Sequence, residues 1–128
     1  MSSIRLLLAD DNPAMLEALV DTLHQTYEIA AALPDGVSVL QQFASLNPDL
    51  IILDISLGDM TGFEVAKRLK KSGCTAKIIF LTVQENIDFV SAAFDLGASG
   101  YVFKSRISSD LSEAIDVVSR GGQFVPAD

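Results

Sequence analysis

Cysteine and long apolar runs are scarce in this chain, and each scarcity excludes a class of protein. Cys74 is the only cysteine, so no disulfide can form within the chain and a reducing compartment is expected. The longest dense apolar runs, Leu6–Ala9 and Leu50–Leu53, are far shorter than a membrane-spanning helix. The first of them ends too soon to serve as the apolar region of a signal peptide. We therefore expect a cytoplasmic protein that does not enter a membrane.

Basic residues are also few. Nine lysines and arginines stand against 17 aspartates and glutamates, which gives a net charge of −8 at pH 7. Binding to a nucleic-acid backbone needs a stripe of positive charge. The one basic cluster consists of Lys67, Arg68, Lys70 and Lys71. This cluster falls on a predicted helix, where a solvated face is the simplest interpretation, so no direct nucleic-acid binding by this domain is expected.

Apolar residues, in contrast, make up 49% of the chain, which excludes a disordered tail. The 128 residues are enough for one compact domain and too few for two ordinary ones. A domain of this length buries roughly two thirds of the surface of its unfolded chain. Hydrophobic burial alone can therefore stabilise it.

Short β-rich runs alternate along the sequence with segments of helical periodicity. The predicted strands are Ile4–Ala9, Glu28–Ala32, Leu50–Leu53, Lys77–Leu81 and Gly100–Phe103. The third and fourth are continuously apolar, as expected for strands that are covered on both faces. Five strands alternating with five helices predict an α/β fold, a doubly wound parallel sheet. In such folds ligands bind beyond the carboxyl ends of the strands, where the strand order reverses.

The predicted helices have apolar residues three or four positions apart and typical end residues. The apolar residues that mark the second helix are Val37, Leu40 and Ala44. Asp35 and Ser109 are predicted N-caps of the second and fifth helices. Thr61 and Glu64 have the spacing of a capping box at the start of the third.

Polar side chains stand at the carboxyl ends of the predicted strands. Asp10 and Asp11 end the first strand, and Asp54 ends the third. Thr82 closes the fourth strand, and Lys104 follows the fifth. Because the carboxyl ends of parallel strands meet at one edge of the sheet, we expect these five side chains to converge.

Three carboxylates brought together repel one another unless a cation offsets their charge. Mg²⁺ suits such a site, because it takes a few oxygen ligands and keeps its other positions for water or phosphate oxygens; Mn²⁺ could substitute for it. A carboxylate such as that of Asp54 can attack a phosphoryl group to give an acyl phosphate. Lys104 and Thr82 would then supply positive charge and a donor to the transferred oxygens.

This pattern resembles the receiver domain of two-component response regulators. The residues that carry the resemblance are Asp10-Asp11, Asp54, Thr82, Tyr101 and Lys104. The stretch from Leu96 to Lys104 is similar to the family's fifth-strand signature, and the resemblance covers the whole chain. It implies a flavodoxin-like (βα)5 fold with strand order 2-1-3-4-5 in residues 1–122, and the start of a C-terminal linker in residues 123–128.

The resemblance also implies a role for each residue. Asp54 accepts a phosphoryl group from a sensor histidine kinase or a histidine phosphotransfer domain. The implied Mg²⁺ ligands are Asp10, Asp11, Asp54 and the backbone carbonyl of Ser56. Lys104 pairs with the phosphoryl group, Thr82 moves to hydrogen-bond it, and Tyr101 follows inward and changes the output surface. Such a domain is not an enzyme, although it assists its own phosphorylation and dephosphorylation.

One departure from the common family pattern points to a subgroup. Ser105 follows Lys104 where many receivers have proline. Receivers joined to a LuxR-type helix-turn-helix output domain often lack this proline, and residues 115–124 resemble theirs. The resemblance therefore implies a regulator of transcription whose output domain lies outside this chain. It leaves open whether the chain forms a homodimer.

Three residues beside the predicted acceptor are expected to tune its chemistry. Val83 stands where the family has a small residue, and its branched side chain is expected to narrow access to Asp54. Ser56 and Gln84 flank the path of an attacking water, so we expect them to influence the lifetime of the phosphoryl group.

Other functions fit less well. A phosphatase of the haloacid dehalogenase type would have a second aspartate two residues after the nucleophile, where this chain has Ser56. A nucleotide- or flavin-binding module would need a glycine-rich loop after the first strand, which here leads into Asp10-Asp11-Asn12-Pro13. The alternative that stays open is a receiver-like interaction module that does not depend on phosphorylation. The intact charged positions argue against it, and Val83 keeps it open.

Overall fold

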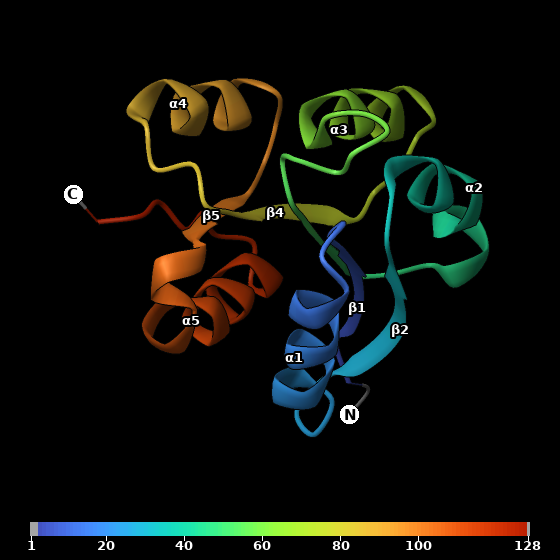
Figure 1. The fold of residues 1–128 in the computed structure, drawn as a ribbon, viewed down its shortest axis with the longest axis horizontal. Coiled ribbons are helices and arrows are strands. Elements are labelled where there is room, and N and C mark those ends of the chain that lie inside the picture. Colours follow the sequence, from blue (N-terminus) through green and yellow to red (C-terminus); the bar gives the residue numbers. More distant parts are fainter. Residues whose placement is uncertain (1–2, 128) are drawn as a thin grey trace.

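Strands and helices alternate through residues 3–127, the part of the chain that the computed structural model describes (Figure 1). The strands are β1 (Arg5–Ala9), β2 (Glu28–Leu33), β3 (Leu50–Leu53), β4 (Lys77–Thr82) and β5 (Gly100–Phe103). The helices are α1 (Pro13–Leu23), α2 (Gly36–Leu46), α3 (Gly62–Lys71), α4 (Ile87–Asp95) and α5 (Ile107–Ser119). All strand pairs are parallel, in the order β2-β1-β3-β4-β5, so the predicted fold and strand order are confirmed.

The sheet separates two hydrophobic cores. Helices α1 and α5 cover one face, while α2, α3 and α4 cover the other (Figure 1). Along β3, Ile51 and Leu53 enter one core while Leu50 and Ile52 enter the other, and all four are at most 1% exposed. Each such side chain contributes roughly 1.5–3 kcal/mol to stability, so the central strands are held firmly in place.

The structure corrects two details of the predicted helices. The helix α5 begins at Ile107 after a 3₁₀ turn (Lys104–Arg106), so Ser109 lies inside the helix and is not its N-cap. Val37 is 44% exposed, because it occupies the first turn of α2, outside the stripe that faces the sheet. That stripe runs through Val39, Leu40 and Phe43, so the prediction for Leu40 is confirmed, whereas Ala44 is exposed like Val37.

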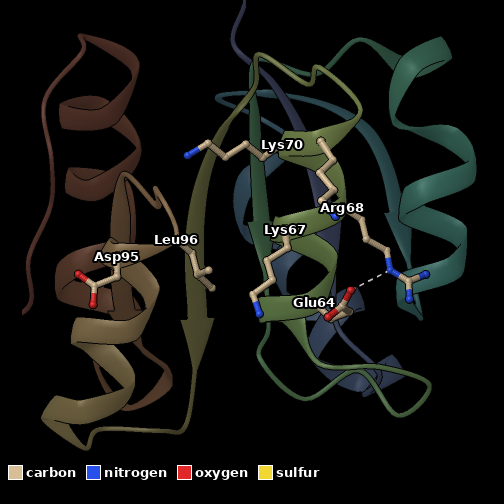
Figure 2. Close-up of a pocket in the computed structure, with 7 residues that line it drawn as sticks. Glu64, Lys67, Arg68, Lys70, Asp95 and Leu96 are labelled. Atoms are coloured by element: carbon tan, nitrogen blue, oxygen red, sulfur yellow. Dashed lines mark hydrogen bonds and ion pairs between the residues drawn. The ribbon is translucent and has the colours of Figure 1, made fainter.

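The predicted N-caps of α2 and α3 are confirmed. The Asp35 side chain accepts a hydrogen bond from the Ser38 N–H at 2.8 Å. The Thr61 hydroxyl accepts from the Glu64 N–H at 3.1 Å. The Glu64 carboxylate accepts from Nε of Arg68, one turn along α3, at 2.9 Å and not from the Thr61 N–H, so only the Thr61 half of the predicted capping box is formed (Figure 2).

A close backbone approach fixes the start of α3 against the end of β3. The Gly62 N–H donates to the Ile55 carbonyl at 2.6 Å. A Cβ at Gly62 would lie 2.1 Å from the backbone oxygen of Asp54, which is far inside contact distance. Only glycine therefore fits here, and α3 begins directly beside Asp54, the residue that follows β3.

The residues after α5 return to the edge of the sheet. The Phe124 N–H donates to the Ser99 carbonyl at 2.9 Å, and the Tyr101 N–H donates to the Phe124 carbonyl at 3.1 Å. Phe124 thus extends the sheet beside β5. The expected domain end at residue 122 stays a prediction, and Asp128, at the end of the expected linker, lies outside the described residues. Within residues 3–127, the helices are too short or too polar to span a bilayer.

Candidate functional site

Three aspartates meet at the carboxyl ends of the central strands. Ala9 of β1 lies beside Leu53 of β3, so Asp10 and Asp54 follow at adjacent positions. These two carboxylates are buried, at 2% and 5% exposure, whereas Asp11 is exposed at the rim. One oxygen from each of the three lies within 4.8 Å of the other two. The predicted convergence of these carboxylates is therefore seen in the structure.

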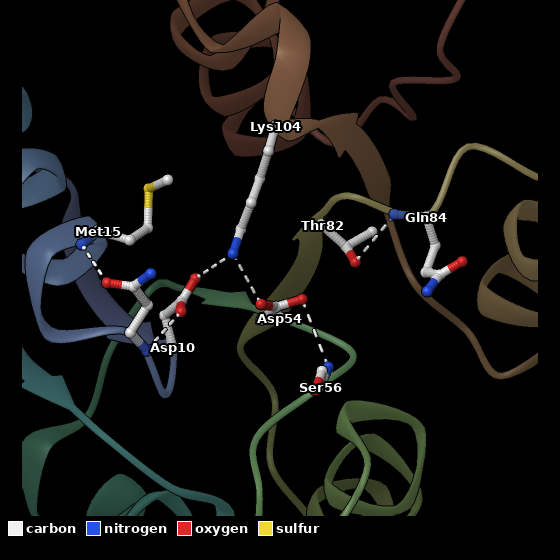
Figure 3. Close-up of polar contacts among 8 residues, drawn as sticks. Asp10, Met15, Asp54, Ser56, Thr82, Gln84 and Lys104 are labelled. Atoms are coloured by element: carbon white, nitrogen blue, oxygen red, sulfur yellow. Dashed lines mark hydrogen bonds and ion pairs between the residues drawn. The ribbon is translucent and has the colours of Figure 1, made fainter.

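Lys104 reaches into the same place from the end of β5 (Figure 3). Its Nζ lies 2.7 Å from Oδ2 of Asp10 and 2.8 Å from Oδ2 of Asp54. Burial disfavours the ammonium charge, but hydrogen bonds to the two carboxylates outweigh burial and raise the pKa of Lys104. Lys104 therefore stays protonated and joins the two buried carboxylates.

The pKa of Asp10 shows how burial acts against the negative charge of this carboxylate. Burial raises the pKa of Asp10, and this effect exceeds the opposing hydrogen bonds from Lys104 and from the Asn12 N–H, which lies 2.9 Å from Oδ1. Lys104 thus does not fully offset the burial of the Asp10 carboxylate. Three carboxylates beside one lysine leave room for a further positive charge at the site.

The donor set fits a hard divalent cation. Mg²⁺ and Mn²⁺ prefer carboxylate and carbonyl oxygens and suit a site with several close carboxylates. The β3–α3 loop passes this site: the Ser56 N–H donates to Oδ1 of Asp54 at 3.4 Å, and Gly58 lies beside the Asp11 carboxylate. The Ser56 carbonyl therefore belongs to the loop that borders the site, and its role as a metal ligand stays a prediction.

The backbone of Gln84 links two further predicted residues. Thr82 is buried, and its hydroxyl accepts from the Gln84 N–H at 3.3 Å. Tyr101 is fully buried, and its hydroxyl donates to the Gln84 carbonyl at 2.7 Å. Burial, and next the charge of Asp54, raises the pKa of Tyr101 to about 12. Tyr101 thus occupies the inward position, whereas its proposed movement with Thr82 stays a prediction.

Val83 lies in the same segment but faces outward. Its side chain is 67% exposed, unlike that of Thr82 immediately before it. If Val83 restricts access to Asp54, it does so from the outer edge of the site. That restriction stays a prediction.

Sequence reasoning missed the residue that anchors the β3–α3 loop. Both carboxylate oxygens of Asp59 accept backbone N–H groups at the start of α2, from Gly36 and Val37, each at 3.0 Å. These two donors favour the ionised form and lower the pKa of Asp59. No local pattern marks this role, because the donors are more than 20 residues away and Asp35 already explains the cap.

Two contacts around the 3₁₀ turn were also not foreseen. The Ser105 hydroxyl donates to Glu85 at 2.8 Å, which joins the turn to the β4–α4 loop. Asp110 is buried and pairs with Arg106 one turn before it, at 3.1 Å. No peptide bond among residues 3–127 is cis, so the bond between Lys104 and Ser105 is trans.

Comparisons with known proteins agree with this geometry. The family model described as "Response regulator receiver domain" matches residues 6–116. The chain is 32% identical over 121 residues to the nitrate/nitrite response regulator NarP of Escherichia coli, an alignment that covers 93% of this chain and 56% of NarP. It is 35% identical over 121 residues to the uncharacterized transcriptional regulatory protein YvfU of Bacillus subtilis, covering 92% of this chain and 60% of YvfU. The chain thus spans a little over half the length of these curated relatives.

Solved structures give the same result. A LuxR-family response regulator from Aurantimonas sp. matches with a TM-score of 0.90 and 27% identity, over 96% of this chain and 89% of that one. The isolated receiver domain of RcsB from Salmonella enterica, determined with the phosphomimetic BeF3⁻, matches with a TM-score of 0.89 and 27% identity, over 98% and 94%. The LuxR-family neighbour agrees with the subgroup expected from the sequence.

Proposed function

Because this chain belongs to the response regulator receiver domain family, we propose that it accepts a phosphoryl group on Asp54 from a histidine kinase or a histidine phosphotransfer domain. The observation that carries the proposal is the position of the Lys104 ammonium, 2.7 Å from Asp10 and 2.8 Å from Asp54 at the end of the central strands. The family membership makes the chain a regulatory domain. Assistance to its own phosphorylation and dephosphorylation is part of the proposal.

In the transfer step, a carboxylate oxygen of Asp54 attacks the phosphorus of a phosphohistidine. The new O–P bond forms as the P–N bond breaks, and the departing imidazole nitrogen keeps the electron pair of that bond. Mg²⁺, held by Asp10, Asp11, Asp54 and the Ser56 carbonyl, would supply positive charge to the phosphoryl oxygens. Mn²⁺ would serve in the same way.

Lys104 has a second task after the transfer. Its ammonium is hydrogen-bonded to Oδ2 of Asp54, and an acyl phosphate leaves that carboxylate without its full negative charge. The phosphoryl oxygens are then the stronger partners, so Lys104 shifts toward them. The lysine thus neutralises Asp54 before the reaction and the phosphoryl group after it.

The signal would leave the site through Gln84. Thr82 and Tyr101 are both hydrogen-bonded to its backbone, at 3.3 and 2.7 Å. A shift of Thr82 toward the phosphoryl group removes one of these bonds and so alters the β4–α4 loop that also holds Tyr101. The surface of α4, β5 and α5 changes as a result. We propose that this change regulates transcription through a domain outside these 128 residues, and that dimerisation is one way in which the change reaches that domain. The proposed location of the protein is the cytoplasm.

Intact-mass measurement tests the proposal. Incubation with acetyl phosphate and Mg²⁺ should add the mass of one phosphoryl group, and EDTA should prevent the addition. The Asp54→Asn variant should show no gain, whereas Asp35→Asn, which keeps an equally good helix cap, should react like the wild type. A gain that persists in Asp54→Asn, or no gain with acetyl phosphate or any histidine kinase, would contradict the proposal.

A further inference from the structure

A second charged region lies between α3 and the end of α4 (Figure 2). It is a groove of about 800 Å³ whose walls are the side chains of α3 from Glu64 to Lys71 and the end of α4 at Asp95 and Leu96. The groove runs along α3 from Glu64 in its first turn, and no residue that lines it belongs to the cluster of Asp10, Asp11, Asp54 and Lys104. The two regions are thus structurally distinct.

The groove concentrates positive charge in an acidic protein. Four of the nine basic residues of the chain fall within residues 67–71. Lys67, Lys70 and Lys71 are three and four positions apart, so they share one side of α3. Arg68 is paired with Glu64. Among residues 3–127, the three lysines have no carboxylate within ion-pair distance.

A structural role explains one of these lysines. Nζ of Lys70 lies near Gly97, 3.6 Å from the position that a Cβ there would take, just beyond the end of α4. A cation near the last turn of a helix interacts favourably with its dipole. Lys67 and Lys71 are like charges at i and i+4, which repel each other on an isolated helix. Lys71 lies in the last turn of α3, where a cation also favours the helix dipole, and the charges of Lys67 and Lys71 favour the ionised form of Glu64. Neither ammonium group has an ion-pair partner among residues 3–127.

The floor of the groove is apolar. Leu96 and the methylene stems of the lysines line it, since long basic side chains bury their stems and keep the charge in water. A second cavity of about 190 Å³ shares Lys70 and Leu96 with the groove and continues it past Cys74 and Ile78. The combined depression is therefore elongated, with an apolar floor and ammonium groups at its rim.

We propose that this groove binds a short acidic, amphipathic segment of a partner protein. The apolar side chains of that segment lie on Leu96 and the lysine stems, and its carboxylates pair with Lys67 and Lys71. The net charge of −8 repels a large acidic surface, including that of a second copy of this chain, from the groove. A short segment keeps its carboxylates within a Debye length of the lysines, so their attraction is felt more than the distant negative charges. The proposal does not depend on phosphorylation of Asp54.

Compact or extended anions fit the groove less well. A phosphate-binding site holds its donors in fixed, convergent positions, whereas these lysines are exposed and mobile along their stems. A nucleic-acid backbone would extend beyond the groove onto a surface that is acidic overall. Both are nevertheless distinguishable by experiment.

The test is an NMR titration of the ¹⁵N-labelled chain with a synthetic amphipathic peptide that has leucines on one face and glutamates on the other. Amide shifts should map to the end of α3 and to Leu96–Gly97, and raising the NaCl concentration should weaken binding. The Lys67→Glu/Lys71→Glu variant should bind about tenfold more weakly. Arg120→Glu, which reverses an exposed charge at the end of α5, should bind like the wild type.

Several results would overturn the proposal. These are shifts on another face, salt-independent binding by the wild type, or equal weakening by Arg120→Glu. If inorganic polyphosphate or duplex DNA produced the same shifts with equal or higher affinity, the ligand of the groove would be a free anion or a nucleic acid and not an acidic protein segment. Circular dichroism tests whether the double variant is folded. If it is unfolded, the salt dependence of peptide binding to the wild type tests the proposal in its place.

Discussion

The acidic site lies at the carboxyl ends of the strands and the basic groove lies along α3, and the two are built in opposite ways. Asp10 and Asp54 follow the central strands, are at most 5% exposed, and are fixed by strand register and by Lys104. The lysines of the groove are exposed on one helix, and Nζ of Lys70 lies near Gly97, just beyond the end of α4. Strand ends thus hold a few groups rigidly, as the proposed binding of one small ion and one phosphoryl group requires. A helix surface offers adaptable charges to a longer ligand.

The largest expected difference between the two ends of α3 concerns its glycines. In Gly62→Ala the new Cβ would meet the Asp54 carbonyl oxygen at 2.1 Å, and backbone atoms cannot move aside easily. We expect a loss of about 3 kcal/mol or more in the free energy of unfolding, measured by urea denaturation. Gly73→Ala, just beyond the other end, has φ +80° but no atom within 4 Å, so its loss should be about 1 kcal/mol. Equal losses would contradict the asymmetry.

The lysines should differ next. Lys104→Met leaves two buried carboxylates facing each other, and we expect it to lower stability by about 2 kcal/mol at neutral pH without metal. Added Mg²⁺ should restore much of this loss, since a cation replaces the missing charge. Lys67→Met in the groove should change stability by less than about 0.5 kcal/mol, with no effect of Mg²⁺. Urea midpoints with and without Mg²⁺ measure both, and similar losses in the two variants would refute the distinction.

Tyr101 gives a smaller, pH-dependent effect. Tyr101→Phe removes the hydrogen bond to Gln84 and should lower stability by about 1 kcal/mol at neutral pH. The folded protein raises the pKa of Tyr101 from 10.0 to about 12, so the buried neutral phenol stabilises the fold below pH 10.0 and this contribution is lost as the pH rises toward 12. The wild type should therefore lose its advantage over the variant across that interval. If the difference in urea midpoint between the two proteins stayed constant from neutral to alkaline pH, the pKa of Tyr101 would not be raised in the folded protein.

The smallest effect is expected at the rim of the acidic site. If Val83 narrows access to Asp54, Val83→Ala should accept a phosphoryl group from acetyl phosphate a few times faster, without a change in stability comparable to that of Gly62→Ala. The rate of mass gain measures this, with Val37→Ala as a control, because Val37 is also exposed but lies on α2. Equal rates for Val83→Ala and the wild type would refute the steric account.

Features that depend on short-range pattern were predictable from the sequence. The strands could be predicted because buried parallel strands are continuous apolar runs, whereas their order was implied by the resemblance to receiver domains. Asp10, Asp54 and Lys104 could be predicted as site residues because they stand at strand ends. Ser109 was predicted as a cap because several serines and aspartates near the start of α5 satisfy the same local rule, and the 3₁₀ turn selects another start. The apolar stripe of α2 was displaced for a similar reason: Val37 has helical spacing but lies in the first turn.

Contacts between segments distant in sequence could not be predicted. Asp59 binds the start of α2, and no spacing rule connects residues so far apart. The contact of Gly62 with Asp54 depends on where α3 packs, so the sequence marked this glycine only as part of a cap. The groove likewise exists because α3 and α4 lie over neighbouring strands, whereas the sequence showed its lysines only as a charged helix face.

The pairing of Phe124 with β5 has a mechanical consequence. Phe124 is joined to Ser99 and to Tyr101 by backbone hydrogen bonds, so the chain leaves the sheet next to Tyr101, the residue proposed to move with Thr82. A rigid-body displacement of β5 would carry this departure point with it. Because coupling between two sites is reciprocal, a force applied to the chain after Phe124 would also displace the backbone of Tyr101.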